Sequence, residues 1–517
     1  MRNTLIEALR RPEVWPHPVE RVELIETHIS WVLLAGDYAC KIKKPVDLGF
    51  LDFSTLEKRR FFCDEELRLN RRTAPGLYLD VVAITGEVDA PEIGGEGPAL
   101  EYAVRMRRFD SEATFDRLLA AGELGAEDID QLAENLAGLH ETAAVAPPDS
   151  RHGTFRAIAG PMRDNFTALN ERLEEPRLAA LADRTRNRLH ELNPVIEQRR
   201  VGGMVRECHG DAHLGNVARI DGSATLFDCI EFNPDLRWID TVCDLAFTVM
   251  DLFFNAADEL AWRLLDRYLE RTGDYPGMQL LPLYIVYRAL VRAKVGAFRL
   301  DDDQADREAV RADIERHIAL AERIAGQRRP ALFITMGVSG SGKSWLAERL
   351  VRRCGLIRIR SDVERKRLFG LPPGASGKSE VGRGLYTREA GERTYDRLVE
   401  LARPVIEAGL PVLIDAACLK KAQRDRFSEL ADSMAIPFGI LQTIAKDELL
   451  QERIARRNEE GGDPSDAGLE VLAHQQKTCE PPAEVEDRQV LTIDSATSDG
   501  TDRVARWIAA LLGPAQD

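Results

Sequence analysis

The segment HGDAHLGN, residues 209–216, places a carboxylate and an amide at a spacing that suits phosphoryl transfer. That chemistry needs an acceptor for the proton of the attacking hydroxyl, ligands for Mg2+, and cations on the nucleotide phosphates. Asp211 can accept the proton, and Asn216 can bind metal through its amide oxygen. The runs VARI and ATLFD flank an Asp-Gly turn and predict a hairpin that brings Asp228 beside Asn216 as a second metal ligand. A surface turn with ordinary Asp and Asn caps is the alternative, and Asp228 at the hairpin end argues against it.

Two lysines upstream, Lys41 and Lys43, alternate along a predicted strand at residues 37–45, so both point to one face. Either could neutralise nucleotide phosphates while pairing with Glu65 or Glu66 on the following helix, and we prefer Lys41 and Glu66. An exposed strand face beside a solvated helix would show the same pattern. No G-x-G-x-x-G precedes these strands, so a glycine loop over the phosphates is absent or replaced.

The second segment, GVSGSGKS at residues 337–344, is a G-x4-G-K-S loop between an apolar run and an amphipathic stretch. A strand before such a loop and a helix after it are the context that phosphate binding requires. Backbone N–H groups would surround the phosphates, and the helix dipole would favour their negative charge. The lysine would reach the phosphates, and the last serine would bind Mg2+. The predicted nucleotide-binding residues are Gly337, Ser339, Gly340, Ser341, Gly342, Lys343 and Ser344.

Two carboxylates follow predicted strands in the same half of the chain. Asp415 comes after four apolar residues and is placed to hold metal-bound water. Asp362 follows residues 355–360, and ligands bind at the carboxyl edge of parallel sheets, so it could orient or deprotonate an acceptor hydroxyl. The alternative for Asp362 is an N-cap of the next helix. Arg365 either binds an acceptor phosphate or only decorates that helix.

A later helix carries Arg453, Arg456 and Arg457 and runs into a Gly/Asp/Pro-rich turn. This arrangement predicts a lid that brings Arg453 and Arg457 over the transferring phosphate as catalytic residues. A charged surface helix is the alternative.

The elements around these residues change character near residues 327–330. Residues 20–110 have strand patterns, and residues 111–325 are nearly all helical apart from one interruption at residues 204–232. After Pro330, five short apolar runs alternate with amphipathic helices, which is typical of a parallel sheet wound on both faces. We therefore predict two domains. Residues 1–327 form a bilobal α+β domain of the protein-kinase layout, and residues 331–517 form an α/β domain of the P-loop NTPase type.

Bulk composition excludes several classes of protein. The 517 residues carry a net charge of −16, which disfavours nucleic acid and anionic membranes as partners. The eight cysteines are scattered without C-x-x-C spacing, as expected for reduced thiols. The first residues show no signal-peptide pattern, and the most apolar stretch, residues 238–265, contains five acidic residues, too many for a membrane span. We expect a cytoplasmic protein.

Residues 20–300 resemble the aminoglycoside phosphotransferase family, which has a protein-kinase-like fold and includes choline-kinase and homoserine-kinase-like relatives. The resemblance rests on LAENLAGLH (132–140), HGDAHLGN, LFD (226–228) and DLAF (244–247). It implies Asp211 as catalytic base, Asn216 and Asp228 as Mg2+ ligands, and Asp244 as a structural anchor of the catalytic loop. The family phosphorylates hydroxyls on many small molecules, so the name does not establish drug resistance. We expect His213 to pack the loop rather than to act in catalysis.

Residues 331–495 resemble small P-loop kinases, with gluconate kinase, zeta-toxin and polynucleotide 5′-kinase as relatives. The resemblance implies Asp362 as general base or acceptor-binding residue and the segment from Arg453 to Arg457 as the lid. It names no substrate, and the acidic balance disfavours a polynucleotide acceptor.

The leading hypothesis is a bifunctional phosphotransferase that uses ATP and Mg2+ and acts on hydroxyls of small-molecule acceptors at two sites. One alternative is an ATP-binding sensor or regulatory protein with an inactive half. Another is polynucleotide or nucleotide-sugar kinase activity in the P-loop half, which would need a basic groove. Neither acceptor, nor the oligomeric state, follows from the sequence. The local cluster that might build such a groove is Arg352, Arg353, Arg358, Arg360, Arg365 and Arg367.

Overall fold

The computed structural model describes residues 2–49, 51–173, 175–301, 306–372, 387–460, 468–482, 489–496 and 500–513. By its contacts the chain divides into two compact units. One unit joins Met1–Ile158 to Glu197–Thr248, and the other joins Ala159–Ile196 to Val249–Asp517.

The first unit contains an antiparallel six-stranded sheet in the order β1-β2-β3-β6-β4-β5. Cys40 and Ile42 face a core that includes helix α1, whereas Lys41 and Lys43 alternate with them and point to the face covered by α2. The predicted strands and helix at residues 28–109 are confirmed. The bounds are α1 Arg2–Leu9, β1 Val22–Glu26, β2 Ser30–Ala35, β3 Tyr38–Lys43, α2 Leu56–Asn70, β4 Tyr78–Glu87, β5 Ala90–Ile93 and β6 Glu101–Arg107.

The rest of this unit holds the loop of residues 209–216 and its hairpin. The hairpin is confirmed: β8 pairs with β9 from Val217↔Leu226 to Ile220↔Ser223. Asp221 and Gly222 both have positive φ (50° and 78°), as a two-residue turn that matches strand twist requires. The bounds are α3 Phe115–Ala120, α4 Ala126–Thr142, β7 Val205–Glu207, β8 Val217–Ile220, β9 Ser223–Leu226, α8 Pro234–Arg237, β10 Trp238–Asp240 and α9 Thr241–Phe254.

The second unit begins with helices. Helices α11 and α12 form an antiparallel pair, and α6 packs against both of them. The bounds are α5 Phe155–Asn170, α6 Arg177–Glu191, α10 Asp258–Thr272, α11 Leu281–Arg299 and α12 Arg307–Gly326. The division between the units falls within α7 Asn193–Val201, between Ile196 and Glu197.

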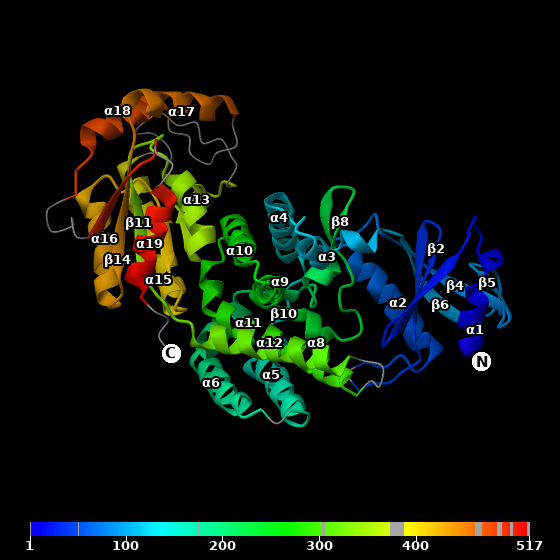
Figure 1. The fold of residues 1–517 in the computed structure, drawn as a ribbon. Helices are drawn as coiled ribbons and strands as arrows, with labels where there is room; N and C mark the ends of the chain where they lie inside the picture. Colours follow the sequence, from blue (N-terminus) through cyan, green and yellow to red (C-terminus); the bar gives the residue numbers. More distant parts are fainter. Residues whose placement is uncertain are drawn as a thin grey trace. The chain divides into compact units, whose positions relative to one another are not determined.

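A five-stranded, fully parallel sheet in the order β12-β13-β11-β14-β15 completes this unit. Helices α13 and α19 pack on one face, with Phe333 and Leu350 in the shared core, and α15 and α16 lie on the other (Figure 1). The predicted parallel sheet wound on both faces is confirmed. The bounds are β11 Leu332–Met336, α13 Lys343–Cys354, β12 Ile357–Arg360, α14 Ser361–Leu368, α15 Arg388–Glu407, β13 Val412–Asp415, α16 Lys421–Ser433, β14 Phe438–Ile444, α17 Asp447–Glu460, α18 Leu469–Thr478, β15 Val490–Asp494 and α19 Gly500–Leu512.

Two details differ from the sequence-based outline. Strand β10 lies beyond the predicted interruption of the helical region, because it completes a short ladder with β7. Helix α12 ends at Gly326 and β11 begins at Leu332, yet the compact units divide elsewhere, so the domain boundary at 327–331 stays a prediction. All eight cysteines are free thiols. Among the described residues, no helix combines the length and apolar character that crossing a membrane demands.

Candidate active sites

A buried carboxylate holds the loop that carries Asp211. Asp244 accepts hydrogen bonds from the backbone N–H of His209 (2.9 Å) and Gly210 (2.8 Å), and His140 Nε2 lies 3.1 Å from it. Gly210 has φ +87°, and a Cβ there would lie 2.8 Å from the Leu236 carbonyl oxygen, so only glycine fits. The anchoring role that the family resemblance implies for Asp244 is confirmed.

Asp211 and Asn216 meet at the mouth of this loop. Asn216 Nδ2 donates to the Asp211 carbonyl oxygen (3.0 Å) and to Asp211 Oδ2 (3.1 Å). His213 accepts a hydrogen bond from the Gly215 N–H through Nδ1 (3.1 Å), and its ring packs edge-on against Phe247. His213 therefore holds the turn, as expected, although its Nε2 also lies 3.6 Å from the Asp211 carboxylate.

The hairpin brings Asp228 to the same place. The Phe227 N–H donates to the Asn216 carbonyl (3.0 Å), which closes the hairpin directly before Asp228. Asp228 adopts φ +60°, a conformation that costs about 1–3 kcal/mol for a residue other than glycine and is concentrated at functional sites. Its N–H donates to the Tyr78 hydroxyl (3.1 Å), and its carboxylate, 42% exposed, lies 2.5 Å from Lys41 Nζ.

Both predicted lysines converge on Glu66. Lys41 Nζ lies 2.9 Å from Glu66 Oε1, and Lys43 Nζ lies 2.7 Å from Glu66 Oε2 and also pairs with Glu231. Burial disfavours the charge on Lys41, but Asp228 and Glu66 more than offset it and raise its pKa. Burial raises the pKa of Glu231. The Lys41 side chain keeps 13% of its surface exposed and the Lys43 side chain none, so Lys41 is the more accessible of the two.

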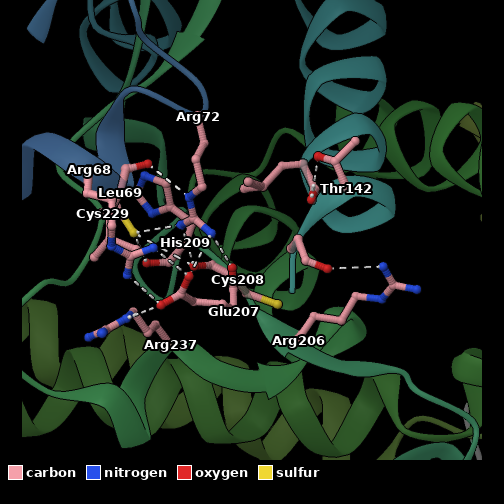
Figure 2. A network of polar contacts seen from close by, with 12 residues as sticks. Arg68, Leu69, Arg72, Thr142, Arg206, Glu207, Cys208, His209, Cys229 and Arg237 are labelled. Carbon is pink, nitrogen blue, oxygen red and sulfur yellow. Dashed lines mark hydrogen bonds and ion pairs between the residues drawn. The ribbon is translucent and has the colours of Figure 1, made fainter. Parts of the chain in front are cut away.

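A second polar network ties helix α2 to the start of the loop (Figure 2). Arg68 Nη2 lies 2.8 Å from Glu207 Oε1, and Arg237 Nε donates to the same oxygen (3.2 Å). Arg72 donates to the backbone carbonyls of Glu207 and Cys208. The helix that supplies Glu66 is thus fixed to the strand that leads into the loop of Asp211.

The glycine-rich loop lies between β11 and α13, as predicted. Gly340 (φ +79°) approaches α17 so closely that a Cβ would lie 2.8 Å from the Leu450 carbonyl oxygen. Lys343 Nζ donates to the Val338 carbonyl (2.9 Å), and burial lowers the pKa of Lys343. The Ser339 N–H donates to Gln475 Oε1 of α18 (2.7 Å).

A cavity of about 560 Å3 opens beside this loop. Ser344 Oγ donates to Asp415 Oδ1 (3.3 Å), while Asp415 Oδ2 is buried with no hydrogen-bond partner among the described residues. A buried carboxylate oxygen without a hydrogen bond, beside a serine hydroxyl, is a donor set that suits Mg2+ or its bound water. The predicted residues that line the cavity are Ser339, Gly340, Gly342, Lys343, Ser344, Asp362, Asp415, Arg453 and Arg457.

The acceptor-side and lid residues also reach this cavity. Asp362 is the second residue of α14, whose N-cap residue is Arg360, so the N-cap alternative for Asp362 was wrong. Arg365 Nη1 donates to Asp362 Oδ1 (3.1 Å). Arg453 donates to the Gly340 carbonyl (3.3 Å) and to Ser495, so the helix is a wall of the cavity rather than a remote surface. The Gly/Asp/Pro turn after it falls at residues 461–467, outside the described residues.

Comparison with known proteins identifies both halves. Residues 82–281 match the model of the phosphotransferase enzyme family, and residues 332–482 match the model of the AAA domain. An uncharacterized protein of Mycobacterium tuberculosis (strain ATCC 25618 / H37Rv) is 31% identical over 477 residues, which cover 88% of this chain and 90% of that protein. The chain therefore belongs to the same family as this protein, and it contains both matched domains, so we call the family two-domain. An uncharacterized protein of Mycobacterium bovis matches to the same extent.

The chain also shows limited similarity to solved structures. A choline/ethanolamine kinase family protein from Mesorhizobium loti is 14% identical, with 62% of this chain and 94% of that chain covered and a TM-score of 0.40. A gluconokinase from Sinorhizobium meliloti 1021 is 23% identical, with 36% of this chain and 93% of that chain covered and a TM-score of 0.26.

In this two-domain family member, the phosphotransferase domain brings together Asp211, Asn216, Asp228, Lys41 and Glu66. The AAA domain brings together most of its predicted residues, but Gly337 and Ser341 do not line the cavity. Both belong to the loop but pack against Thr443 of β14 instead. The roles of these residues stay predictions.

Sequence reasoning missed the buried partners of the sites. Glu231 pairs with Lys43, which is 188 residues away, so no local pattern indicates that pair. Arg358 and Arg360 lie within 4 Å of Asp415 and pair with Asp266 and Glu270 of α10. No local pattern indicates those pairs, because their members are about 90 residues apart.

Proposed function

We propose that this protein is a bifunctional ATP-dependent phosphotransferase that moves the γ-phosphoryl group of ATP to hydroxyls of small-molecule acceptors at two separate sites. The observation that carries the proposal is the cavity beside the glycine-rich loop, about 560 Å3 in volume. The predicted phosphate-binding loop, two carboxylates and the predicted lid arginines all line it. That volume lies within the range of ligand pockets. The eight free thiols support a reducing, cytoplasmic location.

At the first site, Asp211 would accept the proton of the attacking hydroxyl from its partly exposed position on the loop. Asn216 and Asp228 would hold Mg2+, and Lys41, positioned by Glu66, would bind nucleotide phosphates. Mg2+ and ATP supply charge neutralisation and the phosphoryl group when they are bound. Lys41 pairs with Asp228 in this structure, so nucleotide binding would exchange one partner of the lysine for another.

At the second site, the loop N–H groups and Lys343 would cradle the triphosphate, and Ser344 and Asp415 would hold the metal. Asp362 would orient the acceptor hydroxyl or remove its proton, with Arg365 beside it. Arg453 and Arg457 would neutralise charge on the transferring group.

A polynucleotide acceptor is disfavoured by the pairing of the basic cluster. Arg358 and Arg360 bind carboxylates of α10, Arg353 pairs with Asp502, and Arg367 pairs with Glu364. Neutralised arginines do not make the electrostatic stripe that nucleic acid needs. A sensor role for the first site is the second candidate. The direct contact between Lys41 and Asp228 favours it, since that ion pair must break before both groups can serve a Mg2+-nucleotide complex.

The test is transfer of radiolabelled γ-phosphate from ATP to a metabolite pool by the full-length protein and two variants. Asp211→Asn should abolish one set of labelled products and leave the other, and Lys343→Ala should do the reverse. If only the Lys343→Ala variant loses activity, the first site is a sensor. Unchanged turnover in both variants would overturn the two-site proposal.

A further inference from the structure

Helix α10 packs against the AAA domain, although its residues fall in the segment matched by the phosphotransferase model. Trp262 covers Gly355 at the end of α13, where a Cβ would lie 2.9 Å from the indole. Arg263 and Arg267 of α10 both donate to Glu348 Oε1 of α13, at 3.2 and 3.3 Å. The helix and the parallel sheet therefore belong to one compact unit.

Two carboxylates on this helix hold two arginines of strand β12. Arg358 Nε and Nη2 donate to the two oxygens of Asp266, at 3.0 and 2.6 Å. Arg360 Nη1 donates to Glu270 Oε1 at 2.8 Å. Asp266 and Glu270 are four residues apart, so both lie on the face of α10 that meets β12. A two-point contact between guanidinium and carboxylate fixes direction as well as distance.

The same arginines border the carboxylate that is predicted to hold metal. Arg358 Nη1 lies 3.8 Å and Arg360 Nε 3.7 Å from Asp415 Oδ2. These distances exceed hydrogen-bond length, and this oxygen is the buried one that has no hydrogen-bond partner in the described part of the chain. Both guanidinium groups are already at ion-pair distance, and a movement of about 1 Å by either would add a direct hydrogen bond to Asp415.

We propose that Asp266 and Glu270 are positioning residues for the metal site of the AAA domain. They hold Arg358 and Arg360 back from Asp415 Oδ2 and so leave that oxygen to a divalent cation. The Arg358 side chain is 2% exposed, and a buried cation that loses its partner moves toward another carboxylate. Without Asp266, Glu270 and Asp415 are the carboxylates within 4 Å of Arg358 in the described part of the chain. This inference rests on the proposed function of the second site as a Mg2+-nucleotide site.

The test measures Mn2+ binding in the presence of ATP by electron paramagnetic resonance, in the full-length protein carrying Asp228→Asn. That background removes a metal ligand from the first site, and loss of Mn2+ binding on adding Lys343→Ala shows that the signal reports the second site. Adding Asp266→Asn should raise the Mn2+ dissociation constant at least tenfold. Glu348→Gln is the matched control, since it weakens the same helix contact without releasing an arginine near Asp415, and it should change the constant less than twofold.

A double variant separates positioning from packing. Asp266→Asn combined with Arg358→Gln should return the Mn2+ dissociation constant to within threefold of the background, because no guanidinium is left to capture Asp415. If Asp266→Asn unfolds at the assay temperature, Glu270→Gln, which releases the partly exposed Arg360, takes its place. An unchanged constant in the single variant, or an equal loss in Glu348→Gln, overturns the positioning role. If the background itself binds no Mn2+-ATP, the proposed function fails, and the positioning role falls with it.

Discussion

The two sites differ in how close their carboxylates lie to neighbouring cations. In the first site, the cations and carboxylates touch: Lys41 contacts both Glu66 and Asp228. In the second, Asp415 is kept 3.7–3.8 Å from two arginines that are held by carboxylates of α10. The proposed metal ligand Asp228 is thus in direct contact with a lysine, whereas Asp415 Oδ2 has cations nearby but accepts no hydrogen bond among the described residues.

The sites also differ in where their parts come from. The first is built within one compact unit, although Lys41 and Glu66 precede the matched residues 82–281. The second depends on α10, which lies outside the matched residues 332–482. Each matched segment is therefore smaller than the set of elements that builds the proposed site.

The strongest test of a self-contained first site is Lys41→Met. We expect its kcat/KM for first-site transfer to fall by about 10²–10³-fold, the scale for removing one preorganised hydrogen-bond donor from an active site. Mn2+-ATP binding at the second site should not change. Lys44→Met is the matched control, since Lys44 pairs with the exposed Glu26 and should lose less than about twofold. A loss at both sites in Lys41→Met would break the comparison.

The next test concerns stability. Glu66→Gln removes the shared partner of two buried lysines and should destabilise the first unit by about 3 kcal/mol, as measured by scanning calorimetry. Glu26→Gln, which breaks an exposed pair on the same sheet, should cost no more than about 0.5 kcal/mol. Equal effects of the two changes would show that the buried cluster does not hold this unit together.

The contact between α10 and α13 is tested by Gly355→Ala. Gly355 and Gly370 both have positive φ (67° and 71°), but a Cβ at Gly370 meets nothing within 4 Å. Gly370→Ala should lower the free energy of unfolding by about 1 kcal/mol through backbone strain alone. Gly355→Ala should lower it by about 2–3 kcal/mol, because Trp262 must also move. Thermal unfolding measures the difference, and equal costs would mean that Trp262 yields freely.

The smallest expected effect is that of His213→Asn. Asparagine can still accept the Gly215 N–H, so first-site kcat should fall less than about tenfold. A loss of about 10²-fold or more, the range of general acid–base groups, would instead make His213 a catalytic residue beside Asp211. Steady-state kinetics with the first-site acceptor distinguishes the two outcomes.

Local patterns predicted the parts of both sites that sit on single elements. Strand alternation predicted that Lys41 and Lys43 share a face, and the Asp-Gly turn predicted the hairpin that ends at Asp228, because both depend on neighbours along the chain. The parallel sheet followed from five apolar runs for the same reason.

Apart from the pair of Lys41 and Glu66, the tertiary pairs of the two sites could not be predicted in this way. IRIR in β12 alternates apolar and basic residues, a pattern typical of a strand with one face in water, yet Arg358 is buried because α10 covers that face. The choice between Lys41 and Lys43 also depended on Glu231, whose position is fixed only when the hairpin packs against the sheet.

Because α10 packs against the parallel sheet, it limits how the two domains can be separated during evolution. An exchange of genetic material that moved residues 332–482 alone would separate Arg358 from Asp266 and Glu270, uncover it, and leave it beside Asp415. The released guanidinium could then reach Asp415 Oδ2, the oxygen that is proposed to bind a cation. Descendants that keep a working second half should therefore keep α10 as well, even where the first half has lost its own chemistry.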